Sequence, residues 1–506
     1  MTIQLPLFPD EPTVFPNNPV GRSFFSHGKV CSQSERSALE KRYENFLIET
    51  NRFTRKSVSY QGNKGELVHG WIRFKEGFSA QLVEDLVREL GIEPGGKILE
   101  PFAGSATTLL VAKTLGIDAV GIDILPFCHL AWQAKAQFQK YDLDELRQIK
   151  RMLNEIVPGK VDKEFPHITI TQGAFSQKNQ DDIMFYSSWF NSLEISDELK
   201  KLLKLLIMSI LEEVSYTRKD GQYLRWDFRS PKIQARNAKR IAQGKEPTKK
   251  VDIGGIPTVK EALINAFQIV VDDIFKLQSV PFRESHQELI EGNALYVLPT
   301  LTSNQFEGVI SSPPYCNRYD YTRTYALELA YLDVSDNIFN LRQEQLSCTV
   351  ENRSKIEALK TFYTSIGQSD RFQTIISSVQ NNAILNEINA ALITRWKRGD
   401  INNRGILRMV KNYFTELTFI IAELYRVCQP GASVVFVNDN VRYGGEIIPV
   451  DLLTTNLAEE LGFEPVKIYV LSQRKGNSSQ QMGRFGREAL RKSITVWRKP
   501  VEQKKH

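Results

Sequence analysis

Short apolar runs alternate with segments of helical periodicity along most of the chain, which predicts an α/β fold built on a sheet. Helical periodicity is clearest in the segments 34–50, 81–90, 109–113, 413–426 and 452–461. Strands are expected at the apolar runs 96–100, 119–123, 288–291, 308–310, 433–437, 468–471 and 493–497. Two longer stretches, 143–280 and 333–404, separate these strands and are predicted to be mainly helical insertions.

One predicted strand runs into two consecutive prolines. The apolar run 308–310 is followed, after Ser311, by Ser312, Pro313, Pro314 and Tyr315. Prolines supply no N–H and hold the chain extended, so they end the strand. The carbonyls and the serine hydroxyl remain as acceptors, and the tyrosine adds a flat aromatic face. These groups suit a planar base with an exocyclic amine, although two adjacent prolines are also common in ordinary loops.

A second motif places a turn of small residues between a strand and a helix. The strand ends at Glu100, the turn covers 101–106, and the following strand ends on Asp123. In an open α/β sheet, ligands bind at the carboxyl ends of strands, and small residues let a ligand approach the backbone. Asp123 is placed to accept hydrogen bonds from ribose hydroxyls. An ordinary βαβ unit could share the turn, but turn, helix and acidic strand end in this order favour a nucleotide-like ligand.

With both motifs, the chain resembles the DNA amino methyltransferases that depend on S-adenosyl-L-methionine and methylate N4 of cytosine or N6 of adenine. The segment 100–108 matches the family's cofactor motif Asp-Pro-Phe-x-Gly-x-Gly-Thr-Thr, with Glu100 for Asp and Ala106 for the second Gly. The segment 312–315 matches its catalytic motif (Asp/Asn/Ser)-Pro-Pro-(Tyr/Phe/Trp). The resemblance implies a Rossmann-like methyltransferase fold, with a mostly parallel seven-stranded sheet, helices on both faces and large helical insertions. The implied cofactor is S-adenosyl-L-methionine, and no metal is expected.

The resemblance also implies which residues hold the cofactor. The segment 71–79 resembles the part of the family that closes over the methionine end, and 289–294 resembles the strand end that meets the adenine ring. The family more often has Asp at the position of Asn293. The implied cofactor-binding residues are Phe78, Ser79, Glu100, Pro101, Phe102, Ala103, Gly104, Ser105, Thr107, Asp123, Ile124, Asn293 and Ala294.

The predicted catalytic residues are Ser312, Pro313, Pro314 and Tyr315. Hydrogen bonds from the amine to the serine hydroxyl and the Pro313 carbonyl would free its lone pair, and Tyr315 would stack on a base flipped out of the duplex. Tyr319 and Tyr321 are candidates for the same pocket. In the family the Ser form is associated more with cytosine N4, so N4 methylation is expected. The alternatives are adenine N6, an RNA base amine, and a non-catalytic DNA-recognition subunit.

A basic run lies inside the first insertion. Residues 218–250 hold eleven basic side chains against three acidic ones, and aromatic residues interleave with the first part. Basic groups neutralise phosphates, and aromatic groups stack on bases or wedge between them. Such a run is often only a solvated face, but its place in an insertion favours contact with double-stranded DNA. The predicted DNA-binding residues are Arg218, Arg225, Trp226, Arg229, Lys232 and Arg236, with Arg484 from the Gly-rich basic loop 474–487.

Composition narrows the class of protein. A hydrophobic content of 42% with 25% charged residues is ordinary globular usage, and 506 residues imply more than one lobe. Without a membrane-spanning stretch or a signal-peptide layout, a cytoplasmic protein acting on nucleoid DNA is expected. The five cysteines lack the spacing of a disulfide framework or a zinc site. Cys316 does not directly follow Pro314, unlike the nucleophile of cytosine C5 methyltransferases, and is expected to be a small buried residue.

These observations predict a division of the chain into six parts. They are an extended Pro-rich arm (1–33), an N-terminal helix with the cofactor-binding half (34–142), a helical basic insertion that reads DNA (143–287), the catalytic strands (288–332), a second helical insertion (333–405) and the C-terminal half of the sheet (406–500). A partner restriction endonuclease is a further implication of the resemblance.

Overall fold

The computed structural model of the chain describes residues 25–220, 223–334, 337–472, 485–486 and 490–501. Most of the Pro-rich arm and Arg484 lie outside these ranges. The chain divides into two units, the first made of residues 1–58, 298–317 and 354–506 and the second of residues 59–297 and 318–353.

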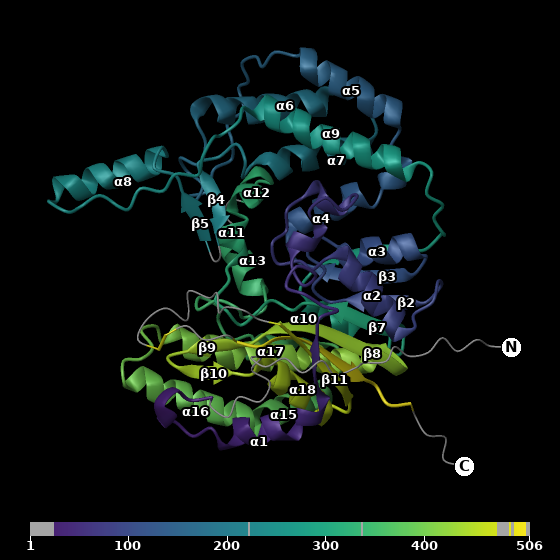
Figure 1. Cartoon of the computed structure of the whole chain (residues 1–506), viewed down its shortest axis with the longest axis vertical. Coiled ribbons are helices and arrows are strands. Elements are labelled where there is room, and N and C mark those ends of the chain that lie inside the picture. The colour runs from purple at the N-terminus through teal and green to yellow at the C-terminus, as the bar shows by residue number, and fades with distance from the viewer. Residues whose placement is uncertain (1–24, 221–222, 335–336, 473–484, 487–489, 502–506) are drawn as a thin grey trace. The chain divides into compact units, whose positions relative to one another are not determined.

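Five strands form the sheet of the first unit, in the order β1-β11-β12-β8-β7 (Figure 1). Their bounds are β1 Leu47–Thr50, β7 Phe306–Ser311, β8 Cys428–Asp439, β11 Glu464–Leu471 and β12 Lys492–Arg498. The strand β1 is parallel to β11, and β7 is parallel to β8, whereas β12 is antiparallel to both its neighbours. The centre of β8 is a buried apolar run, which explains why this strand is recognisable in the sequence.

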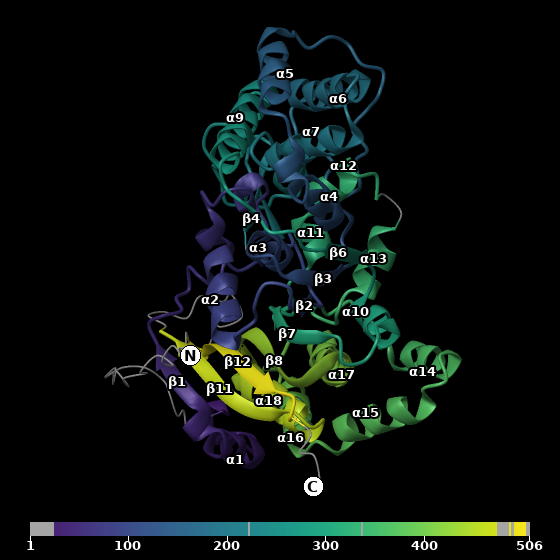
Figure 2. The ribbon, with the colours of Figure 1, turned by 90° about the vertical axis from the view of Figure 1, so that its right-hand side faces the viewer.

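Helices cover this sheet. The helices α17 (Gly405–Val427) and α18 (Val450–Glu460) pack on β8, and α18 also contacts β11 and β12, as Figure 2 shows. The remaining elements of the unit are α1 Ser34–Arg42, α14 Ile356–Ser365, α15 Ser369–Asn381, α16 Ala383–Lys397, the hairpin β9 Val441–Tyr443 and β10 Glu446–Ile448, and the 3₁₀ turns η1 His27–Lys29, η2 Glu44–Phe46 and η6 Leu298–Thr300.

Three parallel strands in the order β2-β3-β6 form the sheet of the second unit. They are β2 Lys97–Glu100, β3 Asp118–Asp123 and β6 Gln287–Glu291, and the helix α3 packs on all three. The helices near this sheet are α2 Ala80–Leu90, α3 Thr107–Leu115, α4 Pro126–Lys135 and α10 Ala294–Val297.

The first insertion is a helical bundle with a protruding arm. The helices α5 Leu143–Glu155, α6 Gln177–Ser192, α7 Asp197–Ile210 and α9 Val259–Leu277 pack together, and the arm is the hairpin β4 Thr217–Asp220 and β5 Tyr223–Trp226 with α8 Pro231–Ala242 (Figure 1). The unit is completed by α11 Tyr321–Thr324, α12 Ala326–Tyr331, α13 Ile338–Glu344 and the 3₁₀ turns η3 Tyr60–Asn63, η4 His69–Trp71 and η5 Phe138–Lys140. In the described part of the chain no helix has both the length and the apolar character that a membrane span requires.

The predicted fold class is confirmed, because the seven expected strands are present and most pairs are parallel.

One expectation is wrong: the segment 34–50 is not a single helix. The helix α1 ends at Arg42, and Leu47–Thr50 forms the edge strand β1. The β-branched Ile48 and Thr50 favour a strand, and pairing with β11 outweighs the charged helical pattern.

A buried ion-pair cluster ties several elements of the first unit together. Glu446 of β10 forms two ion pairs. Its Oε1 lies 2.6 Å from Arg395 Nε, and its Oε2 lies 3.0 Å from Arg36 Nη2. Both guanidinium groups and the carboxylate are almost completely removed from solvent. The cluster therefore joins α1, α16 and the hairpin β9–β10 through charges that depend on one another.

Replacing Glu446 by Gln is expected to lower the free energy of unfolding by about 3 kcal/mol, because two buried guanidinium groups lose a counter-charge. Urea denaturation followed by circular dichroism measures the change. The control is Arg88→Gln on α2, whose ion pair with Glu84 is exposed and is worth less than about 1 kcal/mol. Equal stability of the Glu446 variant and the control would contradict the role of the cluster.

Candidate active site and DNA-contact surface

The turn between β2 and α3 has the shape of a ligand cradle. Gly104 has a φ of +53°, and Ala106, the N-cap of α3, has a φ of +61°. A Cβ on Gly104 would lie 2.6 Å from Cε1 of Phe74, so only glycine fits this position without moving the phenyl ring. The turn is thus held open by a residue without a side chain.

The carboxylate of Asp123, at the end of β3, fixes this turn. Its Oδ2 accepts a hydrogen bond from the amide of Gly104 at 2.8 Å, and its Oδ1 accepts one from the amide of Leu125 at 2.8 Å. Burial raises the pKa of Asp123, which these two amide donors oppose. Each carboxylate oxygen can accept a second hydrogen bond, so the group can also receive ribose hydroxyls.

Glu100, at the end of β2, lies buried beneath the cradle. Burial raises the pKa of this carboxyl group well above its usual value. Its Oε2 has no hydrogen-bond partner among the described residues. A buried carboxylate oxygen without a partner, next to a glycine cradle, fits a ligand that carries an ammonium group and a ribose, as S-adenosyl-L-methionine does.

The predicted residues Phe78 and Ser79 lie at the start of α2. The Ser79 hydroxyl accepts the amide of Leu82 at 3.2 Å and caps this helix. Asn63 was not indicated by any sequence motif, and its Nδ2 donates to the Phe78 carbonyl at 2.8 Å and to Thr107 Oγ1 at 3.5 Å. Asn63 therefore ties the segment 78–79 to the first residue of α3, within the second unit.

Asn293 and Ala294 follow β6, while Ile124 follows β3, so all three stand at carboxyl ends of parallel strands. The Oδ1 of Asn293 accepts the amide of Leu295 at 3.0 Å, and its Nδ2 lies 3.4 Å from Glu344. The side chain thus caps the short helix α10 and remains half-buried at the edge where an adenine ring is expected.

Aromatic rings pack beside the cradle. Phe74 stacks with Tyr325 at 5.3 Å and with Tyr321 at 6.4 Å between ring centroids, and Tyr325 stacks on Phe127 at 4.6 Å. Tyr319 lies edge-on to Tyr321 at 5.0 Å. The structure therefore brings the two tyrosines of the catalytic segment to the ring that closes the cradle. Phe74 belongs to the segment 71–79, which resembles the part of the family that closes over the cofactor, whereas the sequence did not indicate Tyr325.

The catalytic motif follows β7 in the first unit. The Ser312 hydroxyl donates to Tyr315 Oη at 3.2 Å or to the Val437 carbonyl at 3.5 Å. The chain after the motif is fixed by Tyr443, whose hydroxyl donates to the carbonyl of Cys316 at 2.8 Å. Cys316 itself is fully buried, as the sequence predicts. The serine oxygen keeps its lone pairs for a donor such as an amine.

The basic run forms the arm of the second unit. A groove of about 620 Å³ lies between β5, α8 and the segment 248–252. Its lining includes Trp226, Phe228, Ile233, Arg236, Lys249 and Lys250. The helix α8 buries none of its side chains, so its basic residues face outward.

Several predicted DNA-binding residues are already engaged within the arm. Arg218 Nη1 donates to the carbonyls of Glu212 at 2.6 Å and of Thr217 at 2.8 Å. Arg229 pairs with Asp227, with Nε at 2.7 Å from Oδ1. Arg225, Trp226, Lys232 and Arg236 lie in different environments, and Arg484 lies outside the described residues.

Lys232 lies 4.4 Å from the ring of Trp226 and donates to the Ile170 carbonyl at 3.1 Å. Arg225 is exposed on β5, opposite Arg218 in the hairpin. Arg236 is exposed on α8 and has no hydrogen-bond or ion-pair partner among the described residues. Arg225 and Arg236 therefore remain the most accessible of the predicted contacts.

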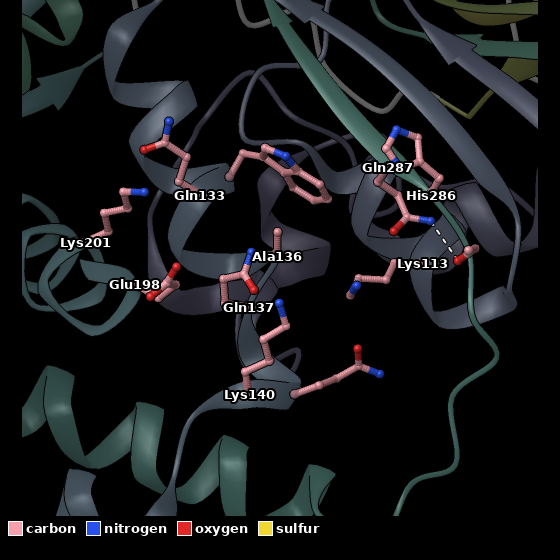
Figure 3. A pocket seen from close by; sticks show the side chains of 12 residues that line it. Lys113, Gln133, Ala136, Gln137, Lys140, Glu198, Lys201, His286 and Gln287 are labelled. Atoms are coloured by element: carbon pink, nitrogen blue, oxygen red, sulfur yellow. Dashed lines mark hydrogen bonds between the residues drawn. The ribbon is translucent and has the colours of Figure 1, made fainter. Parts of the chain in front are cut away.

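A second polar pocket, of about 320 Å³, lies where β6 begins (Figure 3). Its lining includes Lys113, Lys140, Lys201, Glu198 and Gln287. Because β6 begins here, this pocket stands at the amino ends of the parallel strands, opposite the edge where cofactors bind in such sheets. It is therefore distinct from the cradle formed by the turn after β2.

Comparison with known proteins agrees with this geometry. A family model described as DNA methylase matches residues 27–133. The chain is 55% identical over 480 residues to the type II methyltransferase M.BsoBI of Geobacillus stearothermophilus, covering 94% of each chain. It is 38% identical over 475 residues to the type II methyltransferase M.AvaI of a Nostoc species, covering 92% of this chain and 93% of the relative. The chain belongs to the S-adenosylmethionine-dependent DNA methyltransferases that methylate the amino group of cytosine or adenine.

Proposed function

We propose that this methyltransferase forms N4-methylcytosine at a specific site in double-stranded DNA. The observation that carries the proposal is the Ser312 hydroxyl, a neutral acceptor at the end of β7 whose hydrogen is directed to Tyr315 or to Val437. In the resembling family this Ser form accompanies cytosine more often than adenine. N6-adenine methylation is the second candidate, because the two reactions need the same acceptors around an exocyclic amine.

Bound S-adenosyl-L-methionine supplies an electrophilic methyl group, and the side chains of this protein determine how the amine meets it. Ser312 Oγ and the Pro313 carbonyl accept hydrogen bonds from the amine, which favours a tetrahedral nitrogen with a free lone pair. Tyr315 stacks on the base once it has left the duplex. Positioning and oriented acceptors supply most of the acceleration, and no covalent enzyme intermediate is needed.

In the cofactor half, Glu100 and Asp123 are the acids that receive the ligand's donors. The orphan Oε2 of Glu100 suits the amino group of the methionine part, and Asp123 suits the ribose hydroxyls. Gly104 lets the ligand approach the backbone because no side chain fills the cradle.

The arm is the proposed DNA contact. Arg236 and Lys239 project from α8, whose side chains are all at least partly exposed, and the adjoining groove offers Trp226 and Phe228. Cations on an exposed helix suit phosphates, and a groove with aromatic walls suits bases. Arg218, Arg229 and Lys232 make internal contacts, so in this proposal they shape the arm and contribute less to DNA affinity.

The relatives are named type II methyltransferases, and we extend this to a restriction-modification role for the present enzyme. Methylation of the recognition site would then protect host DNA from a partner endonuclease of the same specificity. Such an enzyme would act on nucleoid DNA in the cytoplasm.

The first experiment identifies the product. Purified protein is incubated with S-adenosylmethionine and unmethylated bacterial genomic DNA, and the digested nucleosides are measured by mass spectrometry. We expect N4-methylcytosine. N6-methyladenine would overturn the base assignment and keep the family, whereas the absence of any methylated base on the DNA would overturn the proposed DNA substrate.

Replacing Ser312 by Ala is expected to lower kcat by roughly 100-fold while leaving the Kd for S-adenosylmethionine within about twofold, because one oriented acceptor of the amine is lost. Steady-state kinetics and calorimetric titration of the cofactor separate the two effects. The matched control is Ser311→Ala, one residue earlier on β7, whose side chain is fully buried. Equal loss of catalysis and cofactor binding in the Ser312 variant would argue against its role.

Replacing Arg236 by Ala is expected to weaken DNA binding on all sequences and to reduce the slope of log K against log salt by about one. Fluorescence anisotropy at several salt concentrations measures both quantities. The control is Arg147→Ala on α5, an exposed arginine outside the arm. The same affinity and slope in the two variants would remove α8 from the DNA-contact surface.

A further inference from the structure

Lys492 reaches the catalytic motif from the far end of the chain. It is the first residue of β12 and lies directly opposite Asp439, the last residue of β8. On its other side β8 pairs with β7, and β7 leads into the catalytic motif. Three adjacent strands of the first unit thus bring Lys492, Asp439 and Tyr315 to one edge.

The ammonium group of Lys492 makes three contacts at this edge. Its Nζ lies 3.4 Å from Tyr315 Oη, 5.0 Å from the centroid of the Tyr315 ring and 3.9 Å from Asp439 Oδ2. The lysine side chain is only 12% exposed, whereas the Asp439 side chain is 37% exposed. Burial lowers the pKa of Lys492, but Tyr315 and Asp439 raise it more, so the net direction is upward and the group stays charged.

A charged ammonium group can only donate hydrogen bonds. Tyr315 Oη must therefore act as the acceptor toward Lys492, and its own hydrogen points away from the cation. The Ser312 hydroxyl is also placed to donate to Tyr315 Oη, at 3.2 Å, with the Val437 carbonyl at 3.5 Å as its other acceptor. With Lys492 and Ser312 as donors, both lone pairs of the phenolic oxygen are used, and the lone pairs of Ser312 Oγ remain open.

We propose that Lys492, held by Asp439, is a positioning residue that fixes Tyr315 Oη as an acceptor and thereby keeps Ser312 Oγ as the acceptor of the target amine. The inference rests on the proposed function in one respect, that Ser312 receives the amine. Without the ammonium group, Tyr315 can rotate its hydroxyl and donate to Ser312 Oγ, which would occupy the lone pair that the amine needs. Lys492 acts through Tyr315 and touches no reacting atom.

A similar pair elsewhere in the same sheet provides the control. Lys467 Nζ lies 3.1 Å from Tyr469 Oη and 5.2 Å from the centroid of its ring, on β11. This pair has the same chemistry as Lys492 and Tyr315, but its strand β11 is separated from β7 by β12 and β8. The Lys467→Met variant therefore measures what the loss of a lysine–tyrosine contact does to the stability of the sheet.

The test compares Lys492→Met, Lys492→Arg and Lys467→Met by transfer of a radiolabelled methyl group to DNA, so that methylated cytosine and adenine both count. We expect Lys492→Met to lower kcat about 10- to 100-fold, with the KM for S-adenosylmethionine unchanged within about twofold. Lys492→Arg should recover most of kcat because it restores a cationic donor. Lys467→Met should retain full activity.

A double-mutant cycle separates positioning from a merely structural role. If Lys492 acts through the Tyr315 hydroxyl, Lys492→Met should cause less than a threefold further loss in a Tyr315→Phe background. Additive losses, or a raised KM for DNA with a changed salt dependence and unchanged kcat, would overturn the proposal. If Lys492→Met unfolds, the same cycle is run with Lys492→Gln, which keeps a polar side chain.

The outcomes distinguish this inference from the proposed function. A product of N6-methyladenine overturns the cytosine assignment. The positioning of Ser312 by Lys492 is tested separately, by the double-mutant cycle of Lys492 and Tyr315. Conversely, full kcat in Lys492→Met overturns the positioning role even when N4-methylcytosine is the product.

Discussion

One carboxylate, that of Asp123, holds the turn between β2 and α3 in its folded conformation. Asp123 accepts the amide of Gly104 and the amide of Leu125, so it fixes the turn after β2 and its own strand end together. An unpaired buried amide would cost about 1–3 kcal/mol, which makes the turn dependent on this acid before any ligand arrives. The left-handed Gly104 and the ring of Phe74 then define the cradle. The acidic end of β3 therefore fixes both the turn after β2 and the residues that follow β3, which requires it to lie beside the small-residue turn.

The catalytic motif depends on the opposite property, an excess of acceptors. Two prolines remove donors from the chain, and the Ser312 hydrogen is directed to Tyr315 Oη or to the Val437 carbonyl. Tyr443 fixes the carbonyl of Cys316 and so limits the movement of the residues that follow. Acceptors in a segment whose prolines supply no N–H suit the amine that we propose as the substrate, because the lone pair of that amine must be free for the methyl group. In our proposal the orientation of the Tyr315 hydroxyl matters for the same reason, because a hydrogen bond donated to Ser312 Oγ would occupy this acceptor.

The sequence predicts the fold class, the strands and both motifs, because each depends on local patterns of apolar and small residues. It does not predict β1, whose strand conformation comes from pairing with β11, a segment more than 400 residues away. Nor does it show Asn63 or Tyr325 beside the cradle, since an isolated Asn or Tyr carries no sequence signal for such contacts. The basic run shows the same limit of sequence analysis. The sequence gives the number of cationic side chains, but it does not show that some of them, such as Arg229, pair with groups inside the protein.

The arm shows how internal and external contacts can share one basic segment. An isolated helix as short as α8, with 12 residues, is marginal in water, so it needs anchors. Pro231 starts the helix, and Asn237 Oδ1 accepts the amide of Thr248 at 2.9 Å, which ties the helix to the returning chain. Lys232 adds a contact with Trp226 at the base. Lys232 and Asn237 thus make internal contacts that hold α8 in place, while Arg236 remains exposed farther along the helix, where we propose that it contacts a phosphate.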